Sequence, residues 1–179
     1  MEKETTSHKI LHSFCLNPKL RFSEQVDGEK VILTLRAHPF TQIGWVVNGI
    51  ILILLLYLIS LILPAFITTR QIIIIDIFAI VFIFSYFNFN FINWFYNIGI
   101  ITNKRVVDID LYYIIYKEIT TADLRKIEDV TIKTGGYLES LLNFGNIFIQ
   151  TAGAYPNIEF LNVPQPEKVR QIINTLINQ

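Results

Sequence analysis

Three residues near the N-terminus are of the types that bind zinc or act as nucleophiles. His8, His12 and Cys15 are spaced by four and three residues, so on a helix their side chains would share one face. Structural zinc sites normally close around four ligands, and no fourth ligand is evident nearby. Nothing in the local sequence supports Cys15 and a histidine as a nucleophile–base pair. We therefore predict neither a metal site nor a catalytic residue here.

The rest of the chain shows no sequence motif of catalysis. It contains no phosphate-binding glycine loop, no HExxH pattern and no GxSxG elbow. Lys plus Arg equals Asp plus Glu, fifteen each, so surplus cations for binding nucleic acid are lacking. The single cysteine permits no intrachain disulfide. We predict a protein that is not an enzyme, has no cofactor and does not bind nucleic acid.

Polar residues inside a long apolar run are candidates for contacts within a membrane. Asp76 lies about one turn inside the run, where we expect it at headgroup level near Arg70 rather than as an ion or proton relay. Farther on, polar side chains at spacings of four, three and four would share one helical face: Tyr86, Asn90, Asn93 and Asn97. We expect this stripe to lead from the membrane into a polar domain, although it could also contact a partner helix or line a wet crevice.

A group of cations in the C-terminal half is a candidate contact for anionic lipid headgroups or a protein partner. It consists of Lys104, Arg105, Arg125 and Lys126. From Asn97 onward there are eight Lys and Arg against nine Asp and Glu, so the whole region is about neutral. Scattered surface charge is the alternative interpretation, since it is usual on soluble domains.

Two apolar runs must position these residues. Overall 52% of residues are hydrophobic and 17% are charged, and the mean hydropathy is +0.44. The runs at about 43–64 and 72–94 are each long enough to cross a hydrocarbon core of about 30 Å as a helix. Pro64 ends the first run, and aromatic residues gather at the end of the second, as at a headgroup interface. We predict a two-helix transmembrane hairpin.

Flanking cations predict the orientation of this hairpin. The turn between the runs holds only Arg70, whereas Lys30 and Arg36 precede the first run and Lys104 and Arg105 follow the second. By the positive-inside rule both termini lie in the cytoplasm and the short turn lies outside.

The sequence after the second run alternates in short segments typical of strands. Candidate strands lie at 98–102, 107–111, 114–120, 130–132, 147–151 and 158–163, and Gly135-Gly136 breaks the series. From Pro166 on, Val169, Ile172 and Ile173 begin one apolar face of an amphipathic helix. The fold class is therefore an α+β membrane protein, with a helical hairpin followed by an antiparallel β-barrel or sandwich and a C-terminal helix.

The order of short motifs resembles the bacterial pleckstrin-homology (PH) proteins of the YdbS-like membrane type. The matching segments are Leu35-Arg36-Ala37-His38-Pro39, Ile101-Thr102-Asn103-Lys104-Arg105-Val106-Val107, Asp123-Leu124-Arg125-Lys126-Ile127-Glu128-Asp129-Val130, Phe144-Gly145-Asn146-Ile147 and Val163-Pro164. The resemblance covers about Asp27 to the C-terminus and implies a PH-like barrel on a two-helix anchor, without established catalysis. It divides the chain into an N-terminal polar segment at 1–26, a pre-membrane segment at 27–42, the hairpin at 43–96 and a PH-like domain at 97–179.

These observations predict a non-catalytic module in the bacterial cell membrane. Its partners would be the lipid bilayer and either another protein or a second copy of the chain, with protein or headgroup contacts on the cytoplasmic face. The alternative is a small oligomeric pore or transporter subunit. In it, Asp76 and the stripe of Tyr86, Asn90, Asn93 and Asn97 would surround a water path.

Overall fold

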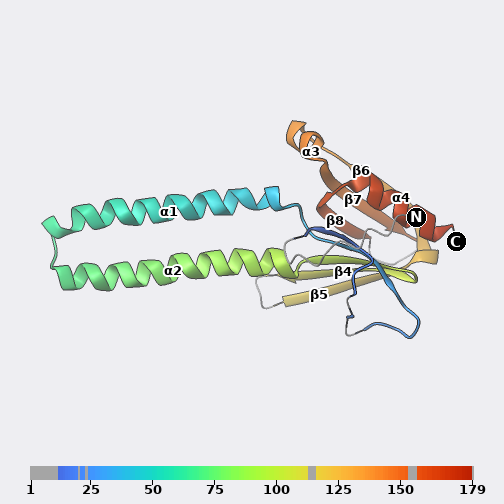
Figure 1. Ribbon diagram of the computed structural model, residues 1–179, viewed down its shortest axis with the longest axis horizontal. Coiled ribbons are helices and arrows are strands. Elements are labelled where there is room, and N and C mark those ends of the chain that lie inside the picture. Colours follow the sequence, from blue (N-terminus) through green and yellow to red (C-terminus); the bar gives the residue numbers. More distant parts are fainter. Residues whose placement is uncertain (1–11, 20, 23, 113–115, 153–156, 179) are drawn as a thin grey trace.

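Two long antiparallel helices project from one end of the β-rich part of the molecule (Figure 1). The computed structural model describes residues 12–178 except 20, 23, 113–115 and 153–156. Helix α1 spans Ile43–Ile62 after a 3-10 turn, η1, at Pro39–Gln42, and α2 spans Thr69–Tyr96. A second 3-10 turn, η2 at Leu63–Ala65, joins them, and Thr68 with Gln71 forms a capping box at the start of α2.

The surfaces of both helices are apolar and uncovered by protein. The segments Pro39–Ala65 and Thr69–Tyr96 are long and apolar enough to cross a membrane, and only 6% of the most apolar window of each is buried. A core helix of a soluble protein would be mostly buried, and an exposed apolar surface of this extent would be costly in water. The two helices therefore indicate a membrane location, with lipid as their solvent.

Small and polar residues hold the two helices together. A Cβ atom on Gly49 would clash with the Phe87 ring, so glycine lets this ring lie against α1 where a larger residue would displace it. Nearer the turn, the Ser60 hydroxyl donates a hydrogen bond of 2.7 Å to Asp76. At the other end, the Trp94 indole N–H donates to the carbonyl of Ala37 at 2.9 Å and ties α2 to the chain before α1.

The described strands form two antiparallel sheets. The first follows chain order: β1 Phe14–Leu16, β2 Val31–Leu35, β3 Ile98–Thr102, β4 Arg105–Tyr112 and β5 Tyr116–Asp123. After a 3-10 turn, η3 at Leu124–Lys126, the second contains β6 Ile127–Lys133, β7 Phe144–Thr151 and β8 Ile158–Pro164. Helix α3, Tyr137–Leu142, lies between β6 and β7, and α4, Pro166–Ile177, follows β8. We call the strands with α3 and α4 the β domain.

The first sheet combines strands from both sides of the hairpin. Strand β2 pairs with β3, with Leu35 opposite Gly99, and β1 pairs with β2. The hairpin is thus inserted between two neighbouring strands of one sheet. The division at 1–26, 27–42, 43–96 and 97–179 stays a prediction as a set of domains, but the sheet itself crosses the boundary at residue 97 and includes strands from the first two segments.

One apolar core fills the space between the sheets and α4. It contains Leu33 and Ile101 from the first sheet, Ile147 and Ile158 from the second, and Ile173 from α4, all 1% exposed or less. Pro166 occupies the first turn of α4, as the sequence predicted, and Val169 and Ile173 are buried. The structure confirms an α+β protein with two long apolar helices, antiparallel sheets and a C-terminal helix.

Candidate functional site

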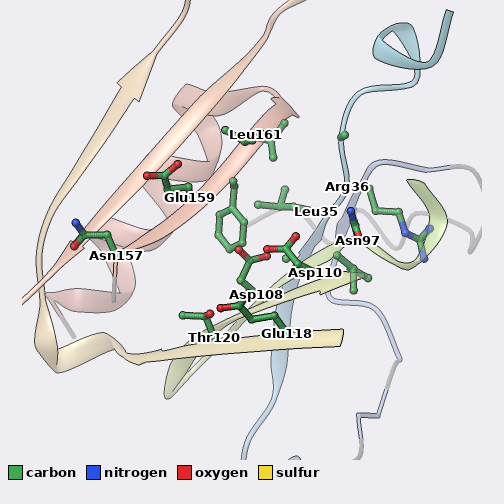
Figure 2. Close-up of a pocket in the computed structure, with 15 residues that line it drawn as sticks. Leu35, Arg36, Asn97, Asp108, Asp110, Glu118, Thr120, Asn157, Glu159 and Leu161 are labelled. Atoms are coloured by element: carbon green, nitrogen blue, oxygen red, sulfur yellow. The ribbon is translucent and has the colours of Figure 1, made fainter. Parts of the chain in front are cut away.

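A groove opens between the two sheets at the end of the β domain that carries the hairpin. Among the described residues no strand pairs with the outer edge of β5 or of β8, so the sheets separate there. The resulting cavity has a volume of about 440 Å³. Figure 2 shows Asp108, Asp110 and Glu118 on the wall formed by β4 and β5, and Glu159 on β8 opposite them. We call this cavity the acidic groove.

The alternating sequence of β4 places these carboxylates in the groove. Asp108 and Asp110 follow Val106 in steps of two residues, so they share its face, which belongs to the main core. Val107 and Ile109 point the other way, into a smaller cluster with Phe22. The alternation predicted a strand with one buried face. In the structure the outer face of β4 is also covered, because the N-terminal segment packs on it.

The pairing of β4 with β5 brings like charges together. Asp110 lies opposite Glu118 in the antiparallel register, and Asp108 lies opposite Thr120. Burial, followed by the charges of Asp110 and Glu118, raises the pKa of Asp108 to about 7. Burial and the charge of Glu118 also raise the pKa of Asp110. Like charges directly opposite each other destabilise a sheet, so this arrangement is not explained by stability.

The hairpin closes one end of the acidic groove. Arg36 is among the residues that line it, and its guanidinium points away from the carboxylates (Figure 2) and lies over the Phe95 ring, 4.3 Å from the ring centre. Burial lowers the pKa of Arg36. Asn97, at the end of α2, accepts a 2.6 Å hydrogen bond from the backbone N–H of Leu111 on β4. Thus the groove opens directly beside the point where both helices enter the β domain.

The predicted cations lie at the opposite end of the β domain. Strand β3 starts at the end of α2 and runs away from the hairpin, so Lys104 and Arg105 follow the turn farthest from the helices (Figure 1). Lys104, Arg105 and Arg125 line one cavity of about 640 Å³ with the end of α4, and Lys126 lines a neighbouring cavity with Arg105. The role of these cations as contacts for headgroups or a partner stays a prediction.

Arg105 already has a partner within the chain. Its Nε atom lies 3.1 Å from a carboxylate oxygen of Glu29, whose side chain is 0% exposed. Burial would raise the pKa of Glu29, but hydrogen bonds from Arg105, Val26 and Thr102 and the charge of Arg105 lower it overall. This buried ion pair attaches the segment before β2 to the start of β4. In contrast, Arg125 is 90% exposed and lies 3.8 Å from Asp123.

The predicted intramembrane polar residues occupy separate environments. Asp76 accepts the hydrogen bond from Ser60, and the Asn90 amide donates to the Tyr86 carbonyl at 2.8 Å within α2. Asn93 is half-buried near the end of α2, with its Oδ1 atom buried. The structure thus places Asp76 near the turn and the asparagines toward the β domain.

The N-terminal histidines and cysteine do not form a described site. His8 lies outside the described residues, His12 is exposed, and Cys15 lies on β1, where its thiol donates to the His12 carbonyl at 3.9 Å. In the part of the chain that the structure describes, no group of three His, Cys, Asp or Glu side chains is placed to hold a metal ion.

The carboxylates of the acidic groove were not among the predicted site residues. The available signal was the Asp-x-Asp alternation of β4 followed by Glu118 on the next strand, which places like charges opposite each other in a hairpin. Glu159 had no such signal, because β8 approaches β4 and β5 only in the folded chain.

Comparisons with known proteins identify the family. A family model described as "Bacterial PH domain" matches residues 38–177, a range that includes both long helices and β3 to β8. Among solved structures, the chain is similar to a duf1696 family protein with a pleckstrin-homology domain from Shewanella loihica PV-4, with 17% identity, a TM-score of 0.34 and coverage of 46% of this chain and 68% of that chain. No curated protein matches the sequence. Because the family model covers more than half of the chain, the protein belongs to the bacterial PH domain family.

Proposed function

We propose that this protein is a non-catalytic, membrane-anchored module that binds a positively charged segment of another protein in the acidic groove. The observation that carries the proposal is the convergence of Asp108, Asp110, Glu118 and Glu159 on one open cavity. The lining residues include no histidine, cysteine or serine, so the groove offers no nucleophile–base pair of the usual kind. The groove instead offers carboxylate charges, amide groups and the outer edges of β5 and β8, with which no described strand pairs.

Charge favours a protein segment over lipid headgroups as the ligand. The surface lipids of the cytoplasmic leaflet are anionic, and the groove carboxylates would repel them. A Lys- or Arg-containing segment would instead be attracted and could pair its backbone with a free strand edge. Asp108 would gain from such a cation, because a nearby positive charge lowers the pKa of a carboxyl group and favours its ionised form.

The pore or transporter alternative receives no comparable support. It needs polar groups of α1 and α2 to face a water path, whereas Asp76 is engaged by Ser60 and Asn90 by its own helix. We therefore retain the binding module as the proposed function.

A binding experiment on the full chain tests the proposal. The protein is placed in nanodiscs of phosphatidylcholine, and a fluorescent extended peptide rich in Lys and Arg is titrated by anisotropy. We expect Asp110→Asn with Glu118→Gln to weaken binding by about tenfold or more, because two facing charges are lost. The matched control, Glu128→Gln with Asp129→Asn on exposed positions of β6, removes the same charge and should retain affinity.

The pH and a cross-linker provide independent readouts. Binding should strengthen as pH rises through about 7, where Asp108 ionises. In native membranes, a photo-cross-linking residue at Leu161 in the groove should capture a protein that the same residue at Glu128 does not. Equal affinity of the groove and control variants, together with equal capture at both positions, would contradict the proposed function.

A further inference from the structure

Helix α3 exposes three large apolar side chains on the surface of the β domain. Tyr137 is 80% exposed, Leu138 is 53% exposed and Leu141 is 64% exposed. Residues three and four apart on a helix are neighbours, so Leu141 lies beside both of the others and the three form one patch. Single exposed apolar residues are normal on soluble proteins, but here three lie together on a helix of six residues, none of which is buried.

The position of α3 is at the membrane end of the β domain. Phe144 starts β7 just after α3, and its ring stacks on His38 with centroids 5.1 Å apart. Phe40, in the turn that leads into α1, lies 6.2 Å from the same ring. Figure 1 shows α3 projecting from this end of the domain on the side of α1. The apolar patch therefore lies beside the place where the chain enters the membrane.

Both ends of α3 are held by specific contacts. The carboxylate of Glu139 accepts a 2.6 Å hydrogen bond from the Gly135 N–H. Gly136 precedes the helix with a φ of +91°, a left-handed value that favours glycine. Asn143 ends it with a φ of +52°, and its carbonyl accepts a 2.8 Å hydrogen bond from the Gln165 N–H. The patch thus has a defined place relative to the hairpin.

We propose that α3 is a second membrane contact, in which Tyr137, Leu138 and Leu141 enter the headgroup–acyl boundary of the bilayer that holds α1 and α2. The hairpin fixes the direction of the membrane normal, so α3 is continuous with that interface without any rearrangement of the domain. A tyrosine with leucines suits this depth, because aromatic rings are enriched at interfaces and leucine gains from the acyl chains.

An exposed side chain on the opposite side of the α1–α2 hairpin favours lipid over a protein as the partner that covers α3. Tyr116, at the start of β5, is 63% exposed. Tyr116 lies near the end of α2. Leu111, close to Tyr116 where β4 turns into β5, is hydrogen-bonded to Asn97 at the end of α2, and Figure 1 shows β5 starting beside that end. The patch on α3 and the exposed Tyr116 ring therefore lie on two sides of the α1–α2 hairpin. One bilayer surface covers both sides at once, whereas a partner protein would have to reach around the helices.

Site-directed fluorescence on the full chain tests the proposal independently of any ligand of the acidic groove. In a Cys15→Ser background, Leu141→Cys is labelled with an environment-sensitive fluorophore, and Val26→Cys is the matched control. Val26 is 54% exposed and lies beside Lys104 and Arg105 at the far end of the β domain. Both variants are reconstituted in vesicles of phosphatidylethanolamine and phosphatidylglycerol that carry a nitroxide near the headgroup.

Three outcomes distinguish whether lipid, water or a second copy of the chain covers the apolar patch of α3. We expect the nitroxide lipid to quench the label at Leu141 by about twofold or more, with iodide in the water quenching it weakly, and the reverse at Val26. Strong iodide quenching without lipid quenching at Leu141 would show a water-exposed patch and overturn the proposal. Protection from iodide without lipid quenching would show that a second copy of the chain covers α3, which also overturns it.

Discussion

Among the residues of the acidic groove, Asp108 imposes the largest free-energy cost on folding, because its carboxyl group is ionised in a partly buried site. Its pKa is raised from 3.8 to about 7, so between these values the folded chain binds more protons than the unfolded chain. The contribution of Asp108 to stability therefore falls as pH rises from about 4 to 7 and then levels off. We expect Asp108→Asn to stabilise the protein at pH 8 by about 2 kcal/mol, a value discounted for the partial exposure of the groove.

Denaturant titration of the protein in detergent checks this prediction across pH. The gain in the free energy of unfolding from Asp108→Asn should shrink as pH falls from about 7 toward 4, because protonating Asp108 then costs less in the folding of the original chain. It should vanish below the unfolded pKa of 3.8, where Asp108 is neutral in both the folded and the unfolded chain. Glu128→Gln, on an exposed position of β6, serves as the control and should show no such trend. A gain that is the same at acid and neutral pH would rule out ionisation as its cause.

Glu29 and Arg105 form the opposite case, in which a charged pair stabilises the fold. The Glu29 side chain is 0% exposed and its pKa is lowered, so its contribution is present above about pH 4.5 and is lost as pH falls through the lower folded value. Removing one partner of a buried pair leaves the other charge uncompensated. We expect Glu29→Ala to cost about 3 kcal/mol at neutral pH, measured by denaturant titration.

The exposed pair Arg125–Asp123 provides the comparison for that measurement. Because Arg125 is 90% exposed, Arg125→Ala should change the free energy of unfolding by less than about 0.5 kcal/mol. If both substitutions cost the same, the Glu29–Arg105 pair would have no special structural role. Arg125 should therefore be replaceable at little cost to the fold when its predicted contact with headgroups or a partner is tested.

At the scale of elements, the main consequence of the structure is that the hairpin interrupts a sheet. Leu35 lies opposite Gly99, so the chain before α1 and the chain after α2 are already adjacent. We expect a variant in which a short Gly/Ser linker replaces residues 37–97 to fold as a soluble β domain. The fragment 97–179 alone lacks β1 and β2, which leaves β3 and the buried core residue Ile101 uncovered on one side.

Two-dimensional amide NMR spectra of the two proteins test this expectation. The linker variant should give dispersed resonances and a cooperative unfolding transition, whereas the fragment should give collapsed resonances or aggregate. A fragment that folds as well as the linker variant would show that β1 and β2 are dispensable. The linker variant also separates the properties of the β domain from those of the membrane hairpin.

Local sequence patterns predicted most elements but not how they combine. The runs that became α1 and α2, the alternation of β3 to β8 and the start of α4 at Pro166 depend on signals within a few residues. Strand β2, Val31–Leu35, was missed because its partner β3 lies more than sixty residues away, on the other side of the helical hairpin. The acidic groove was missed for the same reason, since Glu159 meets Asp108 only when the two sheets pack.

At the scale of the whole molecule, strand pairing determines the relation between the β domain and the membrane. Because β2 and β3 are neighbours in one sheet, the start of α1 and the end of α2 must lie on the same side of the bilayer. The turn at η2 must lie on the other side if both helices cross. This conclusion holds for either orientation, whereas the assignment of the β domain to the cytoplasm depends only on the distribution of flanking cations.

Cysteine labelling from one side of the membrane separates these two statements. In a Cys15→Ser background we place single cysteines at Phe66, 79% exposed beside the turn, and at Val26, 54% exposed on the β domain. A membrane-impermeant maleimide added to intact cells should label Phe66→Cys, and should label Val26→Cys only after permeabilisation, because the flanking cations favour a cytoplasmic β domain. The reverse labelling pattern would show that the β domain lies outside the cell and the turn inside, and it would not contradict the fold. Labelling of both positions in intact cells would contradict the crossing itself, because one hairpin that spans the bilayer cannot present its turn and its β domain to the same solution.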